Sequence, residues 1–304
     1  MVETFSIAEA LRAPLRVIRR HPLAIFVWGL LIVGFVMAMM MLVFGALADI
    51  PLSPDAEPSP QVMGRVVAMQ GVSMLLNIGQ VVLGVMVWAA TMRATFRIGR
   101  PERYFFLRAG MDEVRLAVVG LALFAGAYVA VMAFVIVAAI VSALIWQASP
   151  TAALAVGGVL FVVMIAGVAL AMARVSMIAP ATVLLQRFAF REGWDLGKGR
   201  LMRLFGLLAC TWLIYMLVYF VLAFVVIAAL FFSGAFAVLA DAQDATTLGE
   251  LFPSPAVLWG VAAFVLLPGS FVYGAVITLL SAPFAAACRE LLDGAPRDAA
   301  PAVL

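Results

Sequence analysis

The sequence predicts an all-α, polytopic membrane protein with six transmembrane helices, on the basis of its composition, its long apolar segments and its charge distribution. Hydrophobic residues make up 66% of the 304 residues and charged residues only 12%, whereas soluble globular chains contain about 45–50% apolar and about 25% charged residues. The mean hydropathy is +1.18. This composition excludes a soluble enzyme, a disordered chain and a nucleic-acid-binding module, although the formal net charge is +3.

Six apolar segments are long enough to cross a bilayer. A hydrocarbon core of about 30 Å requires about 20 helical residues. The segments are Leu23–Ala48, Val66–Met92, Leu116–Trp146, Ala152–Ala179, Leu204–Ala240 and Ala256–Ala287. The third and fifth exceed the hydrocarbon thickness, so we expect tilt, a kink or a helix end in water. In the sixth, Pro268-Gly269 predicts a kink or a break.

The basic residues lie almost entirely on one side of these segments. Seventeen of the 19 Lys and Arg residues precede the first span, follow the last, or lie between spans two and three or four and five. The loops on the opposite side carry acidic residues instead, namely Asp49, Asp55, Glu57, Asp241, Asp244 and Glu250. Because cytoplasmic loops hold the excess of Lys and Arg, the sequence predicts that both termini are cytoplasmic.

The order of the connections predicts three parallel hairpin repeats. Each unit consists of an amphipathic segment that ends in Arg and continues into an odd-numbered span. Gly29, Gly120 and Gly206 begin similar Gly-Leu runs, 91 and 86 residues apart. Units that start and end on the same side are related by an axis along the membrane normal. We therefore divide a single transmembrane domain, residues 1–304, into hairpins 1–92, 93–180 and 181–293 and a cytoplasmic tail 294–304. The alternative is the chance periodicity of any six-span chain with basic inner loops.

The first amphipathic segment has the pattern of an interfacial helix. Ser6 and Glu9 match a capping box. Apolar and basic residues then occupy different faces, with Ile7, Leu11, Leu15 and Ile18 on one and Arg12, Arg16 and Arg19 on the other. Such a helix lies in the headgroup plane with its arginines toward anionic lipid. We expect three interfacial segments to contact anionic lipid through Arg12, Arg16, Arg19, Arg100, Arg103, Arg187, Arg191 and Arg200.

Polar residues within the predicted membrane are few. Gln70, Ser73, Asn77, Gln80, Gly84 and Thr91 form a stripe on one face of span two. Because lipid tails cannot hydrogen-bond amides, the stripe must face protein or a water-filled cavity. We favour interhelical hydrogen bonds, and a polar path or headgroup groove is the alternative. Arg174 lies close enough to the inner interface to snorkel; a buried ligand contact is the alternative.

The fourth connection resembles a known family. Pro180 is followed by Trp194-Asp195-Leu196 and by the basic stretch from Gly197 to Arg203, and span six ends in Ala282–Leu291. These features resemble a poorly characterised bacterial integral-membrane family, which includes the membrane domain fused to some glycerophosphodiester phosphodiesterases. The resemblance implies a six-span protein of the bacterial inner (cytoplasmic) membrane. The phosphodiesterase domain of the fused members is absent here, so its activity does not carry over.

The residue types present argue against an enzyme. The predicted spans contain no Asp, Glu, His or Lys, which argues against proton-coupled transport. The carboxylate pairs Asp112–Glu113 and Glu192–Asp195 each lie beside Arg, so we interpret them as solvated, neutralising partners rather than acid/base or metal groups. The lone His21 is interpreted as structural, and the two cysteines, Cys210 and Cys288, as free thiols. We predict no catalytic residue, no metal site and no cofactor.

The sequence thus favours a non-enzymatic protein with a lipid-interacting or scaffolding role in the cell envelope. Its expected partners are membrane lipids, chiefly anionic ones, and not nucleic acid; no protein partner is identified. A transporter or lipid translocator that uses the span-two stripe is the first alternative, and a phospholipid-headgroup enzyme is the second. A cavity lined by Gln70, Asn77 and Gln80 would favour transport, whereas a packed interior would favour the scaffold.

Overall fold

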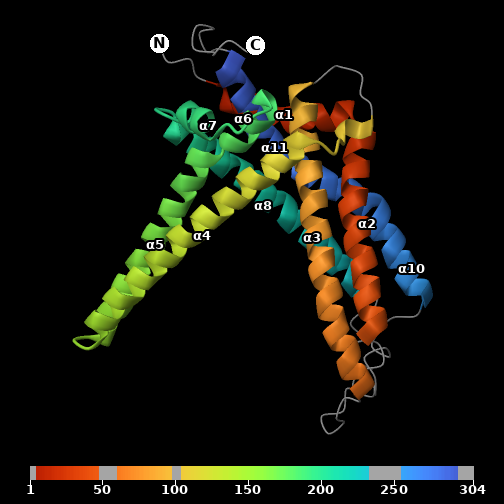
Figure 1. Ribbon diagram of the computed structural model, residues 1–304, viewed down its shortest axis with the longest axis horizontal. Helices are drawn as coiled ribbons and strands as arrows, with labels where there is room; N and C mark the ends of the chain where they lie inside the picture. The colour runs from red at the N-terminus through yellow and green to blue at the C-terminus, as the bar shows by residue number, and fades with distance from the viewer. Residues whose placement is uncertain (1–4, 48–59, 98–103, 233–254, 294–304) are drawn as a thin grey trace.

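The computed structural model describes residues 5–47, 60–97, 104–232 and 255–293, and every regular element within them is helical (Figure 1). Six helices are long and apolar enough to cross a membrane. The chain is therefore an all-α, multi-pass membrane protein, as the composition and the apolar segments predicted. The helices in chain order are α1 Ile7–Arg20, α2 Pro22–Leu47, α3 Pro60–Phe96, η1 Tyr104–Phe106, α4 Met111–Trp146, α5 Pro150–Val175, α6 Ile178–Leu185, α7 Phe190–Leu196, α8 Leu201–Phe232, α10 Pro255–Phe264, η4 Val265–Gly269 and α11 Ser270–Asp293.

Two of the predicted spans are interrupted by a change of helix. The fourth ends at Val175 rather than Ala179, and a new helix, α6, starts at Ile178. This break places Pro180 in the first turn of α6, where a missing N–H removes no helical hydrogen bond. In the sixth span, Pro268 lies inside the π-helical turn η4 between α10 and α11, which confirms the irregularity predicted there. The predicted end of span five, after Phe232, lies outside the described residues.

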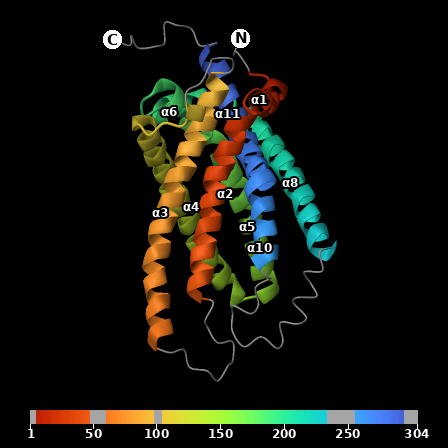
Figure 2. The same cartoon turned by 90° about the vertical axis from the view of Figure 1, so that its right-hand side faces the viewer.

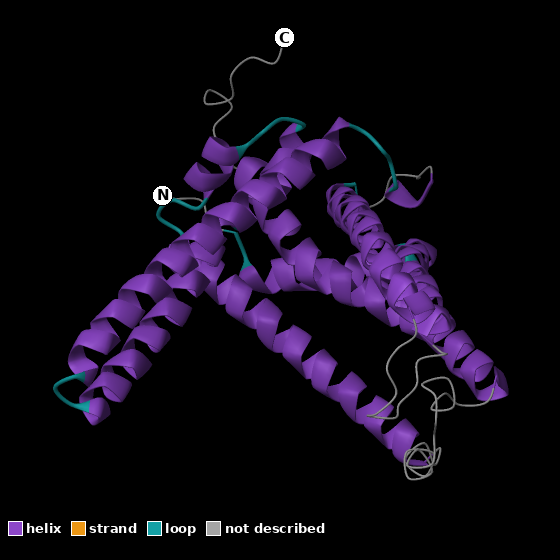
Figure 3. Ribbon diagram, turned by 60° about the horizontal axis from the view of Figure 1, so that its bottom comes forward, coloured by secondary structure: helices purple, strands orange, loops and turns teal. Residues whose placement is uncertain are grey.

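The spans converge at one end and diverge at the other (Figures 1, 2 and 3). Helices α1, η1, α6 and α7 lie at the converging end, together with the adjoining ends of the spans. We call this region the collar and the opposite end the distal end. The described chain begins and ends at the collar. Away from it, the α4–α5 hairpin leans to one side while α2, α3 and α10 lean to the other (Figure 1).

The buried core is concentrated in the collar. One cluster joins α1, α5, α6, α8 and α11 around Met177 and Leu204. A second joins α1, α2, α3 and η1 around Trp28 and Phe106, and a third centres on Met92 and Leu116. By contrast, in the most apolar 18-residue stretch of each span, no more than 17% of the residues are buried within the described chain. The distal parts of the spans therefore expose their apolar side chains to the membrane.

Helices α2 and α11 cross at two glycines that allow backbone contact. A Cβ atom on Gly29 would overlap the carbonyl oxygen of Ser270, and one on Gly274 would overlap the carbonyl oxygen of Ile25. Small residues permit this close approach, which stabilises helix pairs in membranes through van der Waals contact. The crossing therefore holds the first span directly against the last.

Helix α1 packs on protein mainly through small residues that lie beside its predicted apolar stripe. Its buried residues are Ala10, Ala13, Pro14 and Val17. Leu15, which we expected on the apolar face, is 53% exposed. The other three residues of that stripe are partly buried and pack against the core clusters, and residues of α11 and α8 cover the small residues of α1. The interfacial position of α1 stays a prediction.

The predicted capping box of α1 forms only in part. The Ser6 hydroxyl accepts a hydrogen bond from the Glu9 backbone N–H at 3.4 Å. The Ser6 backbone N–H, however, donates to Glu290 of α11 at 3.2 Å, and Glu9 pairs with Arg16. A carboxylate from the last helix therefore takes the place of the Glu9 side chain in the capping box.

The three glycines used to align the repeats have different surroundings. A Cβ atom added to Gly29 would overlap the α11 backbone, and one added to Gly206 would lie 3.5 Å from the Ile7 side chain. A Cβ atom added to Gly120 would have no atom within 4 Å. The threefold repeat and its hairpin boundaries stay predictions.

Candidate functional site

The collar gathers the basic side chains. All the described Lys and Arg residues lie at this end except Arg65, which lies near the distal start of α3 (Figure 1). Two of the eight residues expected to contact anionic lipid, Arg100 and Arg103, lie outside the described residues. The other six differ in their surroundings, and this difference determines which of them is available to a ligand.

The arginines of α1 lie on the face opposite its buried residues. Arg12 and Arg19 are exposed. Arg16 is also exposed, but its guanidinium pairs with Glu9 at 3.5 Å and donates to the Glu9 carbonyl at 3.2 Å. Exposed ion pairs of this kind contribute about 0–1 kcal/mol, so Arg16 can exchange its partner. The arginine face of α1 is therefore positioned to bind an anion.

The three arginines around α7 also have protein partners, but Arg187 and Arg191 are 48% and 94% exposed, so their ion pairs can be exchanged like that of Arg16. Arg187 pairs with Glu192 at 3.0 Å and Arg191 approaches Asp195 at 4.0 Å. Arg200 donates to the carbonyl of Leu196 at 3.2 Å, at the end of α7. The interpretation of Glu192 and Asp195 as neutralising partners of arginine is confirmed.

Arg174 binds protein in the collar, and its predicted extension toward headgroups stays a prediction. Its Nη1 donates to the Gly197 carbonyl at 2.8 Å. Its guanidinium also lies over the Trp194 ring, 4.6 Å from the ring centroid, in a cation–π contact. Arg174 thereby links the end of α5 to the turn after α7, because the break before α6 brings that turn within reach.

The turn η1 has strained backbone. Phe105 and Phe106 have φ of 54° and 63°, in the left-handed region, which costs on the order of 1–3 kcal/mol for such residues. Trp28 Nε1 donates to the Phe105 carbonyl at 2.9 Å, and Arg93 Nε donates to the Phe106 carbonyl at 3.1 Å. The Phe106 ring packs edge-on against Trp28 and His21. Two donors and two rings therefore hold this turn in place.

A buried ion pair lies directly beside the strained turn. Arg93 Nη1 lies 2.6 Å from Glu113 Oε1, and both side chains are 9% exposed. Glu113 Oε2 also accepts from the Gly110 N–H at 2.9 Å at the start of α4. Our interpretation of Glu113 as a solvated residue is therefore wrong, because α3 packs on α4 and places Arg93 against it. Asp112 pairs with Arg115 at 3.1 Å and is more exposed.

The sequence did not predict that Arg93, Glu113 and Trp28 lie together around η1. The Gly110-x-x-Glu113 spacing is a helix-capping signal that was available. The pairing with Arg93 had no local signal.

His21 ends α1 and lies close to this unit. Its backbone N–H donates to the Val17 carbonyl at 2.9 Å. Burial, with a contribution from the charge of Arg20, lowers the pKa of His21. These contacts support the structural role expected for this residue.

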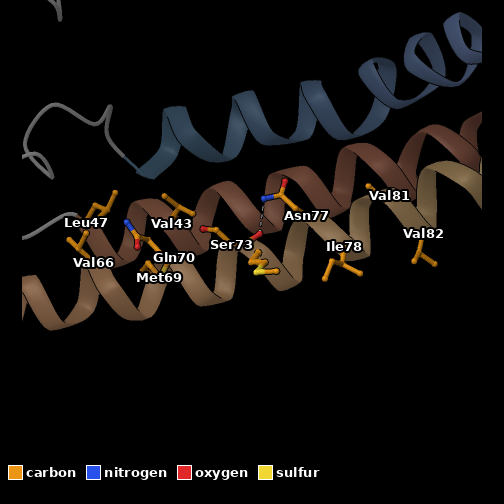
Figure 4. A pocket seen from close by; sticks show the side chains of 11 residues that line it. Val43, Leu47, Val66, Met69, Gln70, Ser73, Asn77, Ile78, Val81 and Val82 are labelled. Carbon is orange, nitrogen blue, oxygen red and sulfur yellow. Dashed lines mark hydrogen bonds between the residues drawn. The ribbon is translucent and has the colours of Figure 1, made fainter. Parts of the chain in front are cut away.

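The polar stripe of span two divides into a buried part and a groove part. Thr91 is buried, donates to the Trp88 carbonyl at 2.8 Å and accepts from Ser281 of α11 at 2.8 Å. This pair is an interhelical hydrogen bond, which is the interpretation we favoured. Toward the distal end, Gln70, Ser73 and Asn77 line a groove of about 730 Å³ (Figure 4).

The groove lies between α2 and α3 and is otherwise apolar. Val43 and Leu47 of α2 face the stripe across it. Asn77 Nδ2 donates to the Ser73 carbonyl at 2.8 Å, so part of its hydrogen-bonding capacity is used within α3. Gln80 is not part of the lining. Of the three residues whose position in a cavity would favour transport, Gln70 and Asn77 therefore line the groove.

Groups that could hold a metal are few. Among the described residues, no three His, Cys, Asp or Glu side chains gather closely enough to hold an ion. Cys210 and Cys288 are free thiols, as predicted.

Comparisons of the chain with protein-family models, curated proteins and solved structures found no match. The resemblance to the family with a phosphodiesterase-linked membrane domain accordingly stays a prediction.

Proposed function

We propose that the chain is a non-enzymatic protein of the bacterial inner membrane that binds anionic lipid through its collar. In this proposal the collar and both termini face the cytoplasm, and lipid binding serves a scaffolding or accessory role in the cell envelope. The main support is the arginine face of α1, where Arg12, Arg16 and Arg19 are exposed while the opposite face packs on protein.

Electrostatics favour this function at the collar. A basic residue near an anionic membrane surface contributes about 1 kcal/mol, and the contribution falls off within a Debye length. The three α1 arginines lie on one side of one rigid helix, so they act on the same patch of membrane. The gathering of the basic residues at one end also supports the proposed orientation.

Lipid analysis tests the proposal. In the triple variant Arg12→Gln, Arg16→Gln and Arg19→Gln, less anionic lipid should copurify than with the wild-type protein at low salt, and the difference should shrink at high salt. Arg65→Gln at the distal end removes a positive charge away from the collar; as the control, it should leave the anionic lipid unchanged. Unchanged anionic lipid in the triple variant, at low and high salt, would show that these arginines act only as topology signals.

Cysteine labelling tests the orientation. In a background with Cys210 and Cys288 replaced, Ser149→Cys in the distal turn between α4 and α5 should react with an impermeant reagent in intact cells. Lys198→Cys in the collar should react only after the membrane is opened. Labelling of Lys198→Cys in intact cells would show that the topology is the reverse of the proposed one.

A lipid translocator is the second candidate, and the groove between α2 and α3 favours it. Amides in an apolar groove can bind a polar headgroup while it crosses the membrane. If the protein is a translocator, purified protein in vesicles should accelerate the exchange of a fluorescent lipid between leaflets, and Gln70→Leu with Asn77→Leu should abolish this effect. Exchange no faster than in empty vesicles would leave the scaffold as the better proposal.

A further inference from the structure

A second cavity lies where the spans converge, just below the collar. It has a volume of about 300 Å³ and is lined by residues of α3, α4, α5, α6, α8 and α11. Trp88, Leu123 and Trp212 give it apolar walls, and Thr211 and Ser281 contribute hydroxyl groups. Its volume is at the lower end of the range found for small-molecule sites.

The hydroxyl of Thr211 distinguishes this cavity from simple packing space. Thr211 is 3% exposed, and its Oγ1 has no hydrogen-bond partner among the described residues. Other buried helical threonines donate to a carbonyl in the preceding turn, as Thr95, Thr182 and Thr278 do at 2.8 Å. Because a buried hydroxyl is seldom left unbonded, Thr211 points to a ligand that accepts a hydrogen bond.

The position of the cavity identifies the leaflet. Met92, which lines it, precedes the collar residue Arg93, and Trp88 lies about one turn farther from the collar. At 1.5 Å per residue these positions lie within about 8 Å of the collar. With the collar at the membrane surface, as proposed above, this depth corresponds to the ester groups of the collar-side leaflet and not to the middle of a hydrocarbon core of about 30 Å.

The diverging spans identify the class of ligand. Below the cavity, the α4–α5 hairpin and α3 separate (Figures 1 and 3), and exposed apolar residues such as Leu121, Phe124 and Val82 cover these helices. In a bilayer, acyl chains fill the space between such helices. A single water could bond to Thr211, but it would leave most of this apolar cavity empty.

We propose that the cavity holds one acyl chain of a phospholipid from the collar-side leaflet, whose ester carbonyl accepts a hydrogen bond from Thr211 Oγ1. The lipid enters from the space between the diverging spans. This site is separate from the arginine face of α1, and apolar contact and one neutral hydrogen bond hold the ligand. Its occupancy is consequently independent of lipid charge and of salt.

Photolabelling in bilayers tests this site. The probe is a phosphatidylethanolamine with a diazirine in one acyl chain close to the glycerol, which has no net charge. In the wild-type protein, the label should appear on α8 around Thr211 and on α3 around Trp88. Thr211→Val, which keeps the shape but removes the hydroxyl, should reduce this labelling about three- to tenfold.

A matched pair of tryptophan variants completes the test. Leu123→Trp fills the cavity from α4 and should abolish the labelling, whereas Leu121→Trp, at a position 69% exposed to lipid on the same helix, should leave it unchanged. Equal labelling in the two variants, or no label on α3 and α8 of the wild-type protein, would overturn the proposal.

Salt separates this site from the proposed function. Labelling should be the same at low and high salt and in the triple α1 arginine variant. Labelling that falls together with the anionic lipid would show that the arginines hold the lipid and would also overturn the cavity proposal. Persistent labelling with unchanged anionic lipid would leave the cavity site standing without the collar function.

Discussion

The collar and the distal parts of the spans differ in what surrounds their side chains. In the collar, Arg93 meets Glu113, Trp28 meets the η1 turn, and Gly29 meets the α11 backbone. In the distal parts, exposed apolar side chains dominate, and the stripe residues Gln70 and Asn77 face a groove. Contacts within the chain therefore determine the structure of the collar, whereas few side chains of the distal parts are buried within the described chain.

This difference has a physical reason. Burial of apolar surface does not drive helices together in lipid, because lipid tails are as apolar as the side chains. Close backbone contacts and polar pairs must supply the specificity instead. Both kinds of contact are concentrated in the collar, so the comparison predicts large effects of substitutions there and small effects elsewhere.

Breaking the buried ion pair should have the largest effect. Glu113→Gln keeps the shape of the side chain but leaves the charge of Arg93 buried and unpaired, which should destabilise the protein by about 3–5 kcal/mol. Unfolding in detergent, followed by circular dichroism, measures this change. Asp112→Asn, in the more exposed pair with Arg115, is the matched control and should cost less than about 1 kcal/mol. Similar losses in both variants would remove the distinction between the two pairs.

A methyl group at the α2–α11 crossing should have the next largest effect. Gly29→Ala forces a Cβ onto the Ser270 carbonyl, and overpacking of this kind costs about 1–3 kcal/mol or more. Gly120→Ala meets open space and should be neutral or stabilising by up to about 1 kcal/mol, since alanine favours helix. The melting temperatures of the two variants give the comparison. A stable Gly29→Ala protein would mean that α2 and α11 separate without cost.

Relieving the strain in η1 should stabilise the collar slightly. Phe105 is partly exposed and has φ of 54°, so Phe105→Gly should increase stability by about 0.5–1 kcal/mol. Phe106 also has positive φ, but its ring is buried against Trp28 and His21, so Phe106→Gly should destabilise. The opposite signs can be read from paired melting curves. If both variants destabilise, the ring of Phe105 matters more than its backbone.

The smallest effect should be a pH dependence due to His21. Its pKa in the folded protein is below the ordinary value of 6.5, so the unfolded chain binds the proton more tightly. The contribution of His21 to stability is therefore complete above about pH 6.5 and is lost as the pH falls toward the lowered pKa. The melting temperature should fall less between pH 7.5 and pH 5.5 in His21→Gln than in the wild-type protein. An identical slope in the two proteins would contradict this role.

The amino-acid sequence by itself determined the six spans and the grouping of basic residues at one end. Both are local properties, because the apolar length of a segment and the charge of a loop do not depend on distant residues. The Pro268-Gly269 irregularity is equally local, because a proline removes a helical hydrogen bond wherever it lies in a helix.

Only the tertiary structure decided which polar groups are paired. Glu290 reaches Ser6 across 284 positions, Ser281 bonds to Thr91 across 190, and Trp28 bonds to Phe105 across 77. The sequence marked Glu113 as one of two neighbouring carboxylates, but packing buried one and left the other more exposed. Whether a charge is solvated or buried depends on the helices that cover it, and the residues that build this cover are distant in the sequence.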